Sequence, residues 1–151
     1  MIFDRTASDV ESARQIISQK VQQFLELTED EIAILEKGCV TVDTLNRIEN
    51  AQKGLTASLV KMRYTPLGVA NKEWTFDDIF NENDFNRIID NLTRIEDAFF
   101  VYNATPKTPT PKYHYQNFND IEKILFDVSA MIDDVKSNYR ECGTFQCGEV
   151  I

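Results

Sequence analysis

The side chains that most often perform nucleophilic or acid–base chemistry are sparse in this chain. His114 is the only histidine, so a serine–histidine or cysteine–histidine mechanism would have to use it. It lies in the run Tyr113-His114-Tyr115 beside a proline-rich segment, a setting that favours packing or an interface over catalysis. The sequence contains no glycine-rich phosphate loop, metalloprotease motif or calcium loop. We therefore predict a protein that is not an enzyme, with no catalytic residue, no cofactor and no small-molecule substrate.

The three cysteines raise the question of a metal site or a disulfide. Cys142 and Cys147 are separated by four residues in a glycine-containing tail. A structural zinc site needs four ligands, commonly as two close pairs, and only Cys39 and His114 remain to complete one. Three cysteines are too few for a disulfide scaffold and favour a reducing compartment. We expect free thiols and no metal, with a Cys142–Cys147 disulfide and a zinc site as the alternatives.

The charge balance argues against several classes of partner. The chain has 25 acidic and 16 basic residues, a net charge of −9. A phosphate backbone or an anionic membrane attracts clustered lysine and arginine, so we expect neither nucleic acid nor membrane as a partner. The start of the chain lacks the basic-then-apolar pattern of a secretory signal. No apolar run approaches the ~20 residues that span a bilayer. We expect synthesis in a cytoplasm without export by a signal peptide.

Capping residues and apolar periodicity predict that helices position these side chains. Gly38 is expected to end the second helix, as a glycine often does just past a helix C-terminus. Gly54 lies inside the third helix, where glycine costs ~1 kcal/mol relative to alanine. The predicted helices span residues 8–26, 28–38, 41–63, 83–102 and 117–139.

Apolar residues in the last three helices advance by three, four, three and four positions. This heptad spacing keeps one apolar strip facing a partner helix. Six or seven buried side chains at ~1.5–3 kcal/mol each contribute roughly 10–20 kcal/mol per helix before conformational entropy is subtracted. The spacing leaves open whether the partner helices belong to the same chain or to another copy. The predicted core residues of these strips are Leu45, Ile48, Leu55, Leu59, Phe85, Ile88, Leu92, Ile95, Phe118, Ile121, Leu125, Val128 and Ile132.

These elements together predict an all-α protein. We expect an antiparallel bundle of about four long helices with short capping helices over residues 1–139, followed by a short tail at 140–151. Pro106, Pro109 and Pro111 exclude a helix between the fourth and fifth helices and predict an extended, polyproline-like strap.

The strap and the tail carry aromatic residues, which are enriched at protein interfaces. An extended segment can lie along a neighbouring subunit, or it can simply return the chain over its own bundle, and the sequence leaves both open. The candidate interface residues are Tyr102, Pro109, Tyr113, His114, Tyr115 and Phe145.

The three heptad helices also begin alike, with an apolar residue, Asn, any residue and Ile. Similar threonine-containing capping runs precede the first two, near residues 28 and 75. We interpret this as a repeated helical unit starting near residues 28, 75 and 115, with chance similarity of good caps as the alternative. The matching runs are Leu45-Asn46-Arg47-Ile48-Glu49, Phe85-Asn86-Arg87-Ile88-Ile89 and Phe118-Asn119-Asp120-Ile121-Glu122.

The run from Trp74 to Ile88, WTFDDIFNENDFNRI, resembles an element of tailed-phage and prophage proteins. In those proteins a Trp-Thr-x-x-Asp turn followed by Asp-Phe or Asp-Tyr, Asn, Arg and Ile recurs in tail and baseplate genes. The whole chain is similar to short proteins of phages that infect gut Firmicutes, which share stretches like residues 1–6 and 137–143.

The resemblance implies a virion structural protein of the tail, the baseplate or the fibre attachment. Such a protein is made in the host cytoplasm and then assembles with other virion proteins and with copies of itself. The resemblance carries over no catalytic residue. The alternative is a phage-encoded helical regulator or inhibitor that stays outside the virion and binds a host protein.

Overall fold

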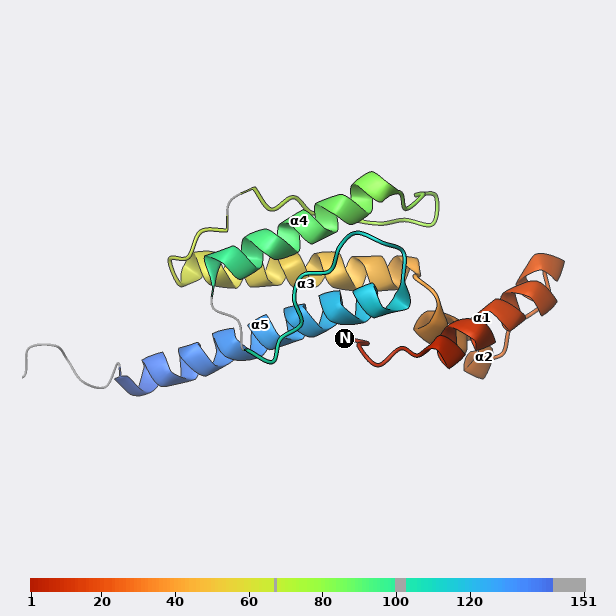
Figure 1. The fold of residues 1–151 in the computed structure, drawn as a ribbon, viewed down its shortest axis with the longest axis horizontal. Helices are drawn as coiled ribbons and strands as arrows, with labels where there is room; N and C mark the ends of the chain where they lie inside the picture. Colours follow the sequence, from red (N-terminus) through yellow and green to blue (C-terminus); the bar gives the residue numbers. More distant parts are fainter. Residues whose placement is uncertain (67, 100–102, 143–151) are drawn as a thin grey trace, which may run out of the picture.

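The computed structural model describes residues 1–66, 68–99 and 103–142, with side chains up to residue 138, and the described chain contains helices and no strand. The all-α class is therefore confirmed (Figure 1). The elements in chain order are α1 (Ala7–Gln19), the 3₁₀ turn η1 (Val21–Gln23), α2 (Glu29–Gly38), α3 (Val42–Lys61), α4 (Glu82–Ala98) and α5 (Tyr115–Cys142).

Short polar side chains set the starts of the first four α-helices. Thr6, Thr28 and Asn81 each accept a hydrogen bond from a backbone N–H of the first turn and form a reciprocal capping box. Thr41 caps α3 in the same way without the reciprocal bond. Thr28 and Thr41 lie where the sequence predicts helix starts, whereas Thr6 and Asn81 lie two residues before the predicted starts at 8 and 83.

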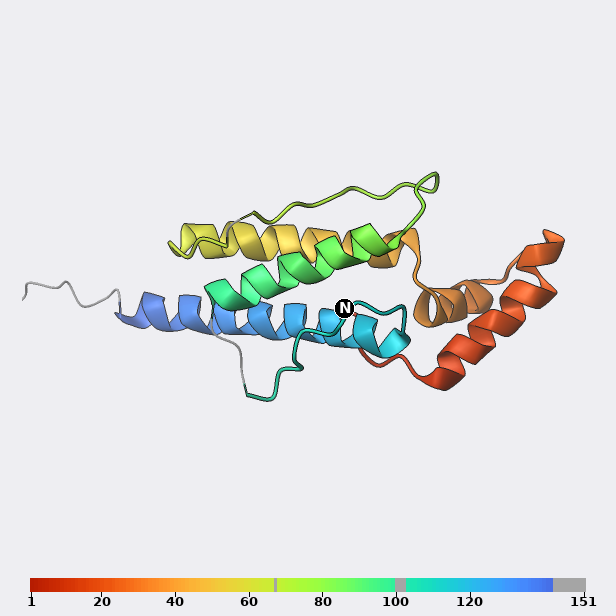
Figure 2. The ribbon, with the colours of Figure 1, turned by 45° about the horizontal axis from the view of Figure 1, so that its top comes forward.

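The helices α3, α4 and α5 pack side by side and run in the same direction (Figures 1 and 2). Contacts advance together along neighbouring helices: Glu49 of α3 meets Arg87 of α4, and three residues on Gln52 meets Asn91. The expectation of an antiparallel bundle of about four long helices is therefore wrong. Three long helices form the core, and they are parallel.

The length of the connections explains this arrangement. Short loops make neighbouring helices antiparallel, but residues 62–81 and 99–114 separate the three long helices. A 17-residue helix such as α4 is only about 26 Å long at a rise of 1.5 Å per residue. An extended segment of the shorter connection spans about 50 Å, which is ample to lead the chain back to the end where it started.

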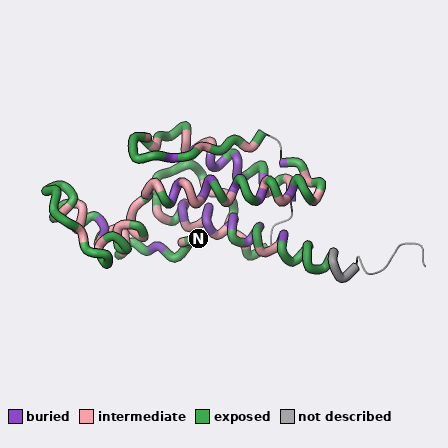
Figure 3. Tube along the Cα trace, turned by 180° about the vertical axis from the view of Figure 1, so that it is seen from behind, coloured by how far each residue is buried: buried purple, intermediate pink, exposed green. Residues whose placement is uncertain are grey.

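One apolar cluster lies between α3, α4 and α5. Figure 3 shows buried positions recurring along these three helices. Each of the predicted core residues lies in this cluster and is buried, whereas Val135, the next position of the α5 strip after Ile132, is exposed. Trp74, Ile89 and Ile124 join the cluster from outside the strips, and Phe99 continues the α4 strip four residues after Ile95. The core is thus made by three helices of one chain.

The first two helices form a separate hairpin, called the arm here (residues 6–41). The arm extends beyond the end of the core where α3 and α5 begin (Figures 1 and 2). Its helices contact each other closely, and Ala13 is the single fully buried residue of α1, η1 and α2. A Cβ atom at Gly38 would lie 2.3 Å from the Asp9 carbonyl oxygen and 2.5 Å from the Ala13 Cβ. Gly38 is the last residue of α2. The close approach of α1 and α2 at this position explains why it is a glycine.

Two glycine-to-alanine substitutions should have opposite effects. Gly54→Ala meets no atom within 4 Å and removes a flexible residue from α3, so it should raise the free energy of unfolding by up to ~1 kcal/mol. Gly38→Ala should push α1 and α2 apart. Amide hydrogen exchange should then become faster in α1 and α2 and stay unchanged in α3 to α5. Unchanged exchange in the arm would contradict the close crossing.

Candidate functional site

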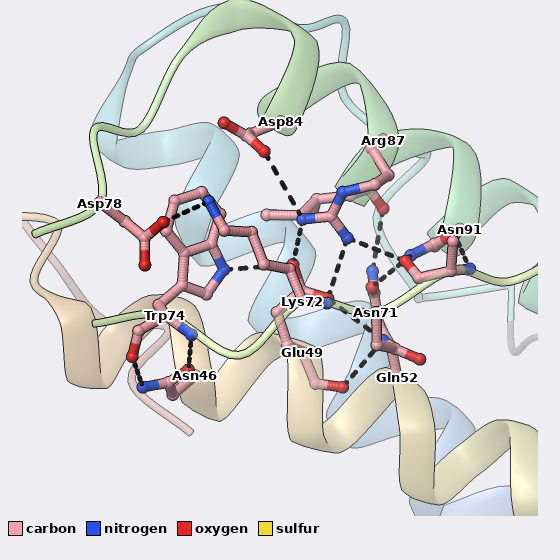
Figure 4. Close-up of polar contacts among 12 residues, drawn as sticks. Asn46, Glu49, Gln52, Asn71, Lys72, Trp74, Asp78, Asp84, Arg87 and Asn91 are labelled. Atoms are coloured by element: carbon pink, nitrogen blue, oxygen red, sulfur yellow. Dashed lines mark hydrogen bonds and ion pairs between the residues drawn. The ribbon is translucent and has the colours of Figure 1, made fainter.

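Two side chains on one face of α3 hold the segment that returns toward α4 (Figure 4). Asn46 donates from Nδ2 to the Trp74 carbonyl (3.0 Å), and its Oδ1 accepts from the Trp74 backbone N–H (2.8 Å). One turn further on, Glu49 accepts a hydrogen bond from the Trp74 indole Nε1 (3.3 Å) and pairs with the Arg87 guanidinium of α4. We call Asn46 and Glu49 the first clamp.

The polar contacts continue from the first clamp into the core. Gln52 donates to the Ile88 carbonyl (2.9 Å), and Asn91 donates to the Gln52 side chain (3.1 Å). Asn91 also bonds the backbone of Ala70 through both of its side-chain atoms. Gln52 and Asn91 are almost fully buried. Buried polar side chains need hydrogen-bond partners, and these bonds supply them for both amides. This network fixes segment 70–74 against both α3 and α4.

A second clamp on α5 has the same construction. Asn119 donates to the Arg5 carbonyl (2.9 Å) and accepts from the Arg5 backbone N–H (3.2 Å). Glu122 lies one turn further on and accepts from Arg5 Nη2 (2.8 Å). Arg47 of α3 donates to Glu122 from Nε (3.2 Å) and Nη2 (3.0 Å). We call Asn119 and Glu122 the second clamp.

The captured segments are also alike. Arg5 and Trp74 are each followed by a threonine, and an aspartate three residues later accepts from that threonine's backbone N–H and hydroxyl. The structural counterpart of residues 74–78 is thus residues 5–9, not the capping run near residue 28. The repeated pattern in the sequence therefore includes a binding arrangement: Asn-x-x-Glu on a helix, and a residue followed by Thr-x-x-Asp on the segment.

The remaining helix of the repeat, α4, departs from this pattern. Ile89 stands where the clamps have glutamate, and α4 instead supplies Arg87 to the first clamp. In α5 the position of the arginine is taken by Asp120. Each clamp glutamate therefore pairs with an arginine of a neighbouring helix. Glu49 of α3 pairs with Arg87 of α4, and Glu122 of α5 pairs with Arg47 of α3.

The two clamp glutamates are held in the ionised form. Burial raises the pKa of Glu49, but hydrogen bonds from Arg87 and Asn71 outweigh it, so the pKa lies below its ordinary value. Burial likewise raises the pKa of Glu122, and hydrogen bonds from Arg47 and Arg5 bring it below its ordinary value. A general base is most effective with a pKa near the working pH, so these carboxylates are suited to holding cationic groups rather than to moving protons.

A cavity of about 510 Å³ separates the arm from the core. Cys39 and His114 both line it, so the structure places these two distant residues at one cavity. Burial raises the pKa of the Cys39 thiol above its ordinary value. Among the residues that the structure describes, no group of three His, Cys, Asp or Glu side chains could hold a metal ion. The side chains of Cys142 and Cys147 lie outside the described part.

Of the predicted interface residues, Tyr113, His114 and Tyr115 line the cavity between the arm and the core. Tyr113 stacks on Phe85 with ring centroids 5.3 Å apart, yet 58% of its surface is exposed. His114 is exposed, whereas Pro109 and Tyr115 are half-buried. Tyr102 and Phe145 lie outside the described residues. Sequence spacing does not reveal the clamps, because their partners are far apart along the chain. The available signal was the glutamate three residues after Asn46 and Asn119, at a position next to the apolar strip.

Comparison of the chain with protein families, curated proteins and solved structures finds no match. None of the helices in the described part combines the length and apolarity needed to cross a lipid bilayer.

The repeated asparagines allow a matched test of the first clamp. Asn46→Ala removes both hydrogen bonds to the Trp74 backbone and should lower the free energy of unfolding by about 1–3 kcal/mol. Asn86 occupies the equivalent position in α4, and its side chain makes no hydrogen bond within the described chain, so Asn86→Ala should change stability by less than ~0.5 kcal/mol. Urea unfolding followed by fluorescence of the single tryptophan measures both. Equal losses would contradict the clamp.

The lowered glutamate pKa values predict acid sensitivity. Because the folded-state values lie below the ordinary 4.5, the stabilisation is complete above that pH and is lost as pH falls through the folded-state values. Glu49→Gln should cost about 3 kcal/mol at pH 7 and should make stability fall less steeply between pH 7 and pH 3. Glu73→Gln, at an exposed carboxylate nearby, should keep the wild-type pH dependence. Parallel urea-stability profiles for wild type and Glu49→Gln would refute this assignment.

Proposed function

We propose that this chain is a non-enzymatic structural protein of a phage virion, placed at the tail, the baseplate or the fibre attachment. It acts by helix-mediated assembly with other virion proteins and with copies of itself. The supporting observation is the arm, which projects from the core and leaves large apolar side chains in contact with water. Grouped exposed apolar residues on a projecting element are typical of protein interaction surfaces. These residues are Val21, Phe24, Leu25, Ile32, Ile34 and Val40.

The core is suited to be the fixed base of such an assembly protein. Each clamp joins two helices and a crossing segment by charged hydrogen bonds, which specify one arrangement of the parallel helices. The second clamp holds Arg5, and α1 begins two residues later, so the arm is attached at a rigid point.

We further propose that residues 103–114 act as a polyproline-like strap across the core. Thr105 donates to Asp127 of α5 (2.9 Å), and Thr108 bonds Glu96 of α4. Asn117 donates to the carbonyls of Thr110 (2.8 Å) and Lys112 (2.9 Å). These bonds favour a connector over its own helices, which leaves the arm as the principal assembly surface.

Mass spectrometry of purified particles of the phage or prophage that encodes the chain tests the proposal. We expect the protein in stoichiometric amount relative to known tail proteins. Light scattering of the purified protein should show multimers. If it shows a monomer, that monomer should bind a purified particle protein when the two are mixed. Absence from the particles would overturn the virion role and favour a regulator that binds a host protein. A monomer that binds no particle protein would count equally against assembly.

A further inference from the structure

We propose that the far end of the arm binds a basic amphipathic helix of a partner protein. This inference rests on the proposed assembly function and names the surface and the partner chemistry. The surface is called the arm tip and consists of Val21, Phe24, Leu25 and Ile32.

Phe24 is the most unusual residue of the arm tip. The Leu25 N–H bonds the Lys20 carbonyl and the Phe24 N–H bonds the Val21 carbonyl, which is the Schellman arrangement that ends a helix. The residue at the position of Phe24 is left-handed in this motif and is usually glycine. Phe24 adopts φ of 54°, and 96% of its surface is exposed. A phenylalanine here is unfavourable for the backbone and contributes almost nothing to packing, so its ring is free to enter a partner.

The other apolar residues lie close to this turn. An ion pair of 2.7 Å between Lys20 and Glu31 joins the end of α1 to the first turn of α2. Val21 and Ile32 directly follow these two residues, and both are more than 40% exposed. Leu25, which follows Phe24, is 51% exposed. The arm therefore presents apolar side chains from both of its helices at one end.

The arm lacks the third layer that would cover these side chains. Two helices with Ala13 as their single fully buried residue do not enclose a core of their own. Helices reach stable packing when an apolar stripe is covered by another element. One additional helix laid across the arm tip would complete a three-helix unit.

The charge around the arm tip selects the kind of helix. Glu26, Glu29, Asp30 and Glu36 are exposed, and none forms an ion pair with the described residues. Glu29, Ile32 and Glu36 share a face of α2 by their spacing of three and four residues.

The only cation between residues 20 and 36 is Lys20, which is paired with Glu31. A second copy of the arm tip would bring acidic groups against acidic groups, which is unfavourable. A partner helix with an apolar strip flanked by lysine or arginine matches both the apolar side chains and the acidic charge of this surface.

The probe is a synthetic amphipathic helix of about 18 residues built from leucine and lysine, labelled with a fluorophore. Binding is measured by fluorescence anisotropy at about 50 mM and about 300 mM NaCl. We expect the full-length protein to bind this peptide more tightly at the lower salt. The same peptide with glutamate in place of lysine should not bind.

Phe24→Gly is the decisive variant because glycine removes the ring and suits the left-handed backbone. It should weaken peptide binding at least ~10-fold while leaving thermal stability equal or higher. Phe76→Gly is the matched control, since Phe76 is 92% exposed on the loop between α3 and α4 and lies outside the arm. The double variant Glu29→Gln with Glu36→Gln should weaken binding and reduce its salt dependence.

Each contrary outcome overturns the proposal. Equal weakening by Phe24→Gly and Phe76→Gly would show that binding is not specific to the arm tip. Equal binding of the acidic peptide would exclude the charge argument. Self-association of the protein that is lost in Phe24→Gly would assign the arm tip to a second copy. Stoichiometric presence in particles together with failed peptide binding would refute only the arm-tip proposal, whereas specific peptide binding with absence from particles would refute only the virion role.

Discussion

Glu49 and Glu122 each accept hydrogen bonds from an arginine of a neighbouring helix and from a chain segment that crosses the helix surface. Removing such a carboxylate from water costs several kcal/mol, and only a complete set of donors offsets this cost. The donors must therefore arrive together from separate parts of the chain. For Glu122 they come from Arg5, Arg47 and the backbone of Ile2. This requirement fixes which helices are neighbours, how they are aligned and where the connecting segments lie.

The same requirement links the core to the arm. Arg5 is captured by the second clamp, Thr6 caps α1 immediately afterwards, and the arm returns to the core where Thr41 caps α3. Both attachments of the arm therefore lie at the end of the core where the clamps are. The arm itself gains little from burial, because Gly38 and Ala13 provide a close crossing but no large apolar side chain. Anchoring at its base and exposure at its far end are complementary properties of one interaction element.

The sequence was informative where structure depends on local spacing. The apolar strips that begin at Leu45, Phe85 and Phe118 lie in one core because a 3-4 repeat records the geometry of a helix directly. Helix direction is not recorded there, because it depends on how far the connections reach. The clamps could not be predicted from local spacing either, because their partners are distant in sequence. Asn46 bonds Trp74, 28 positions away, and Asn119 bonds Arg5, 114 positions away. The sequence also directed attention to aromatic residues of the proline segment, whereas the grouped exposed apolar residues lie on the arm.

Parallel packing has an electrostatic consequence for the molecule as a whole. Every α-helix carries a dipole with its positive end at the N-terminus, and in α3, α4 and α5 these dipoles point the same way and add instead of cancelling. Asp43 in α3 and Glu82 and Asp84 in α4 lie in first turns and offset part of the positive potential at that end. The core thus has an axial polarity, so two molecules approaching end to end attract each other in one orientation and repel in the reversed one. A stack built from such units would have a direction.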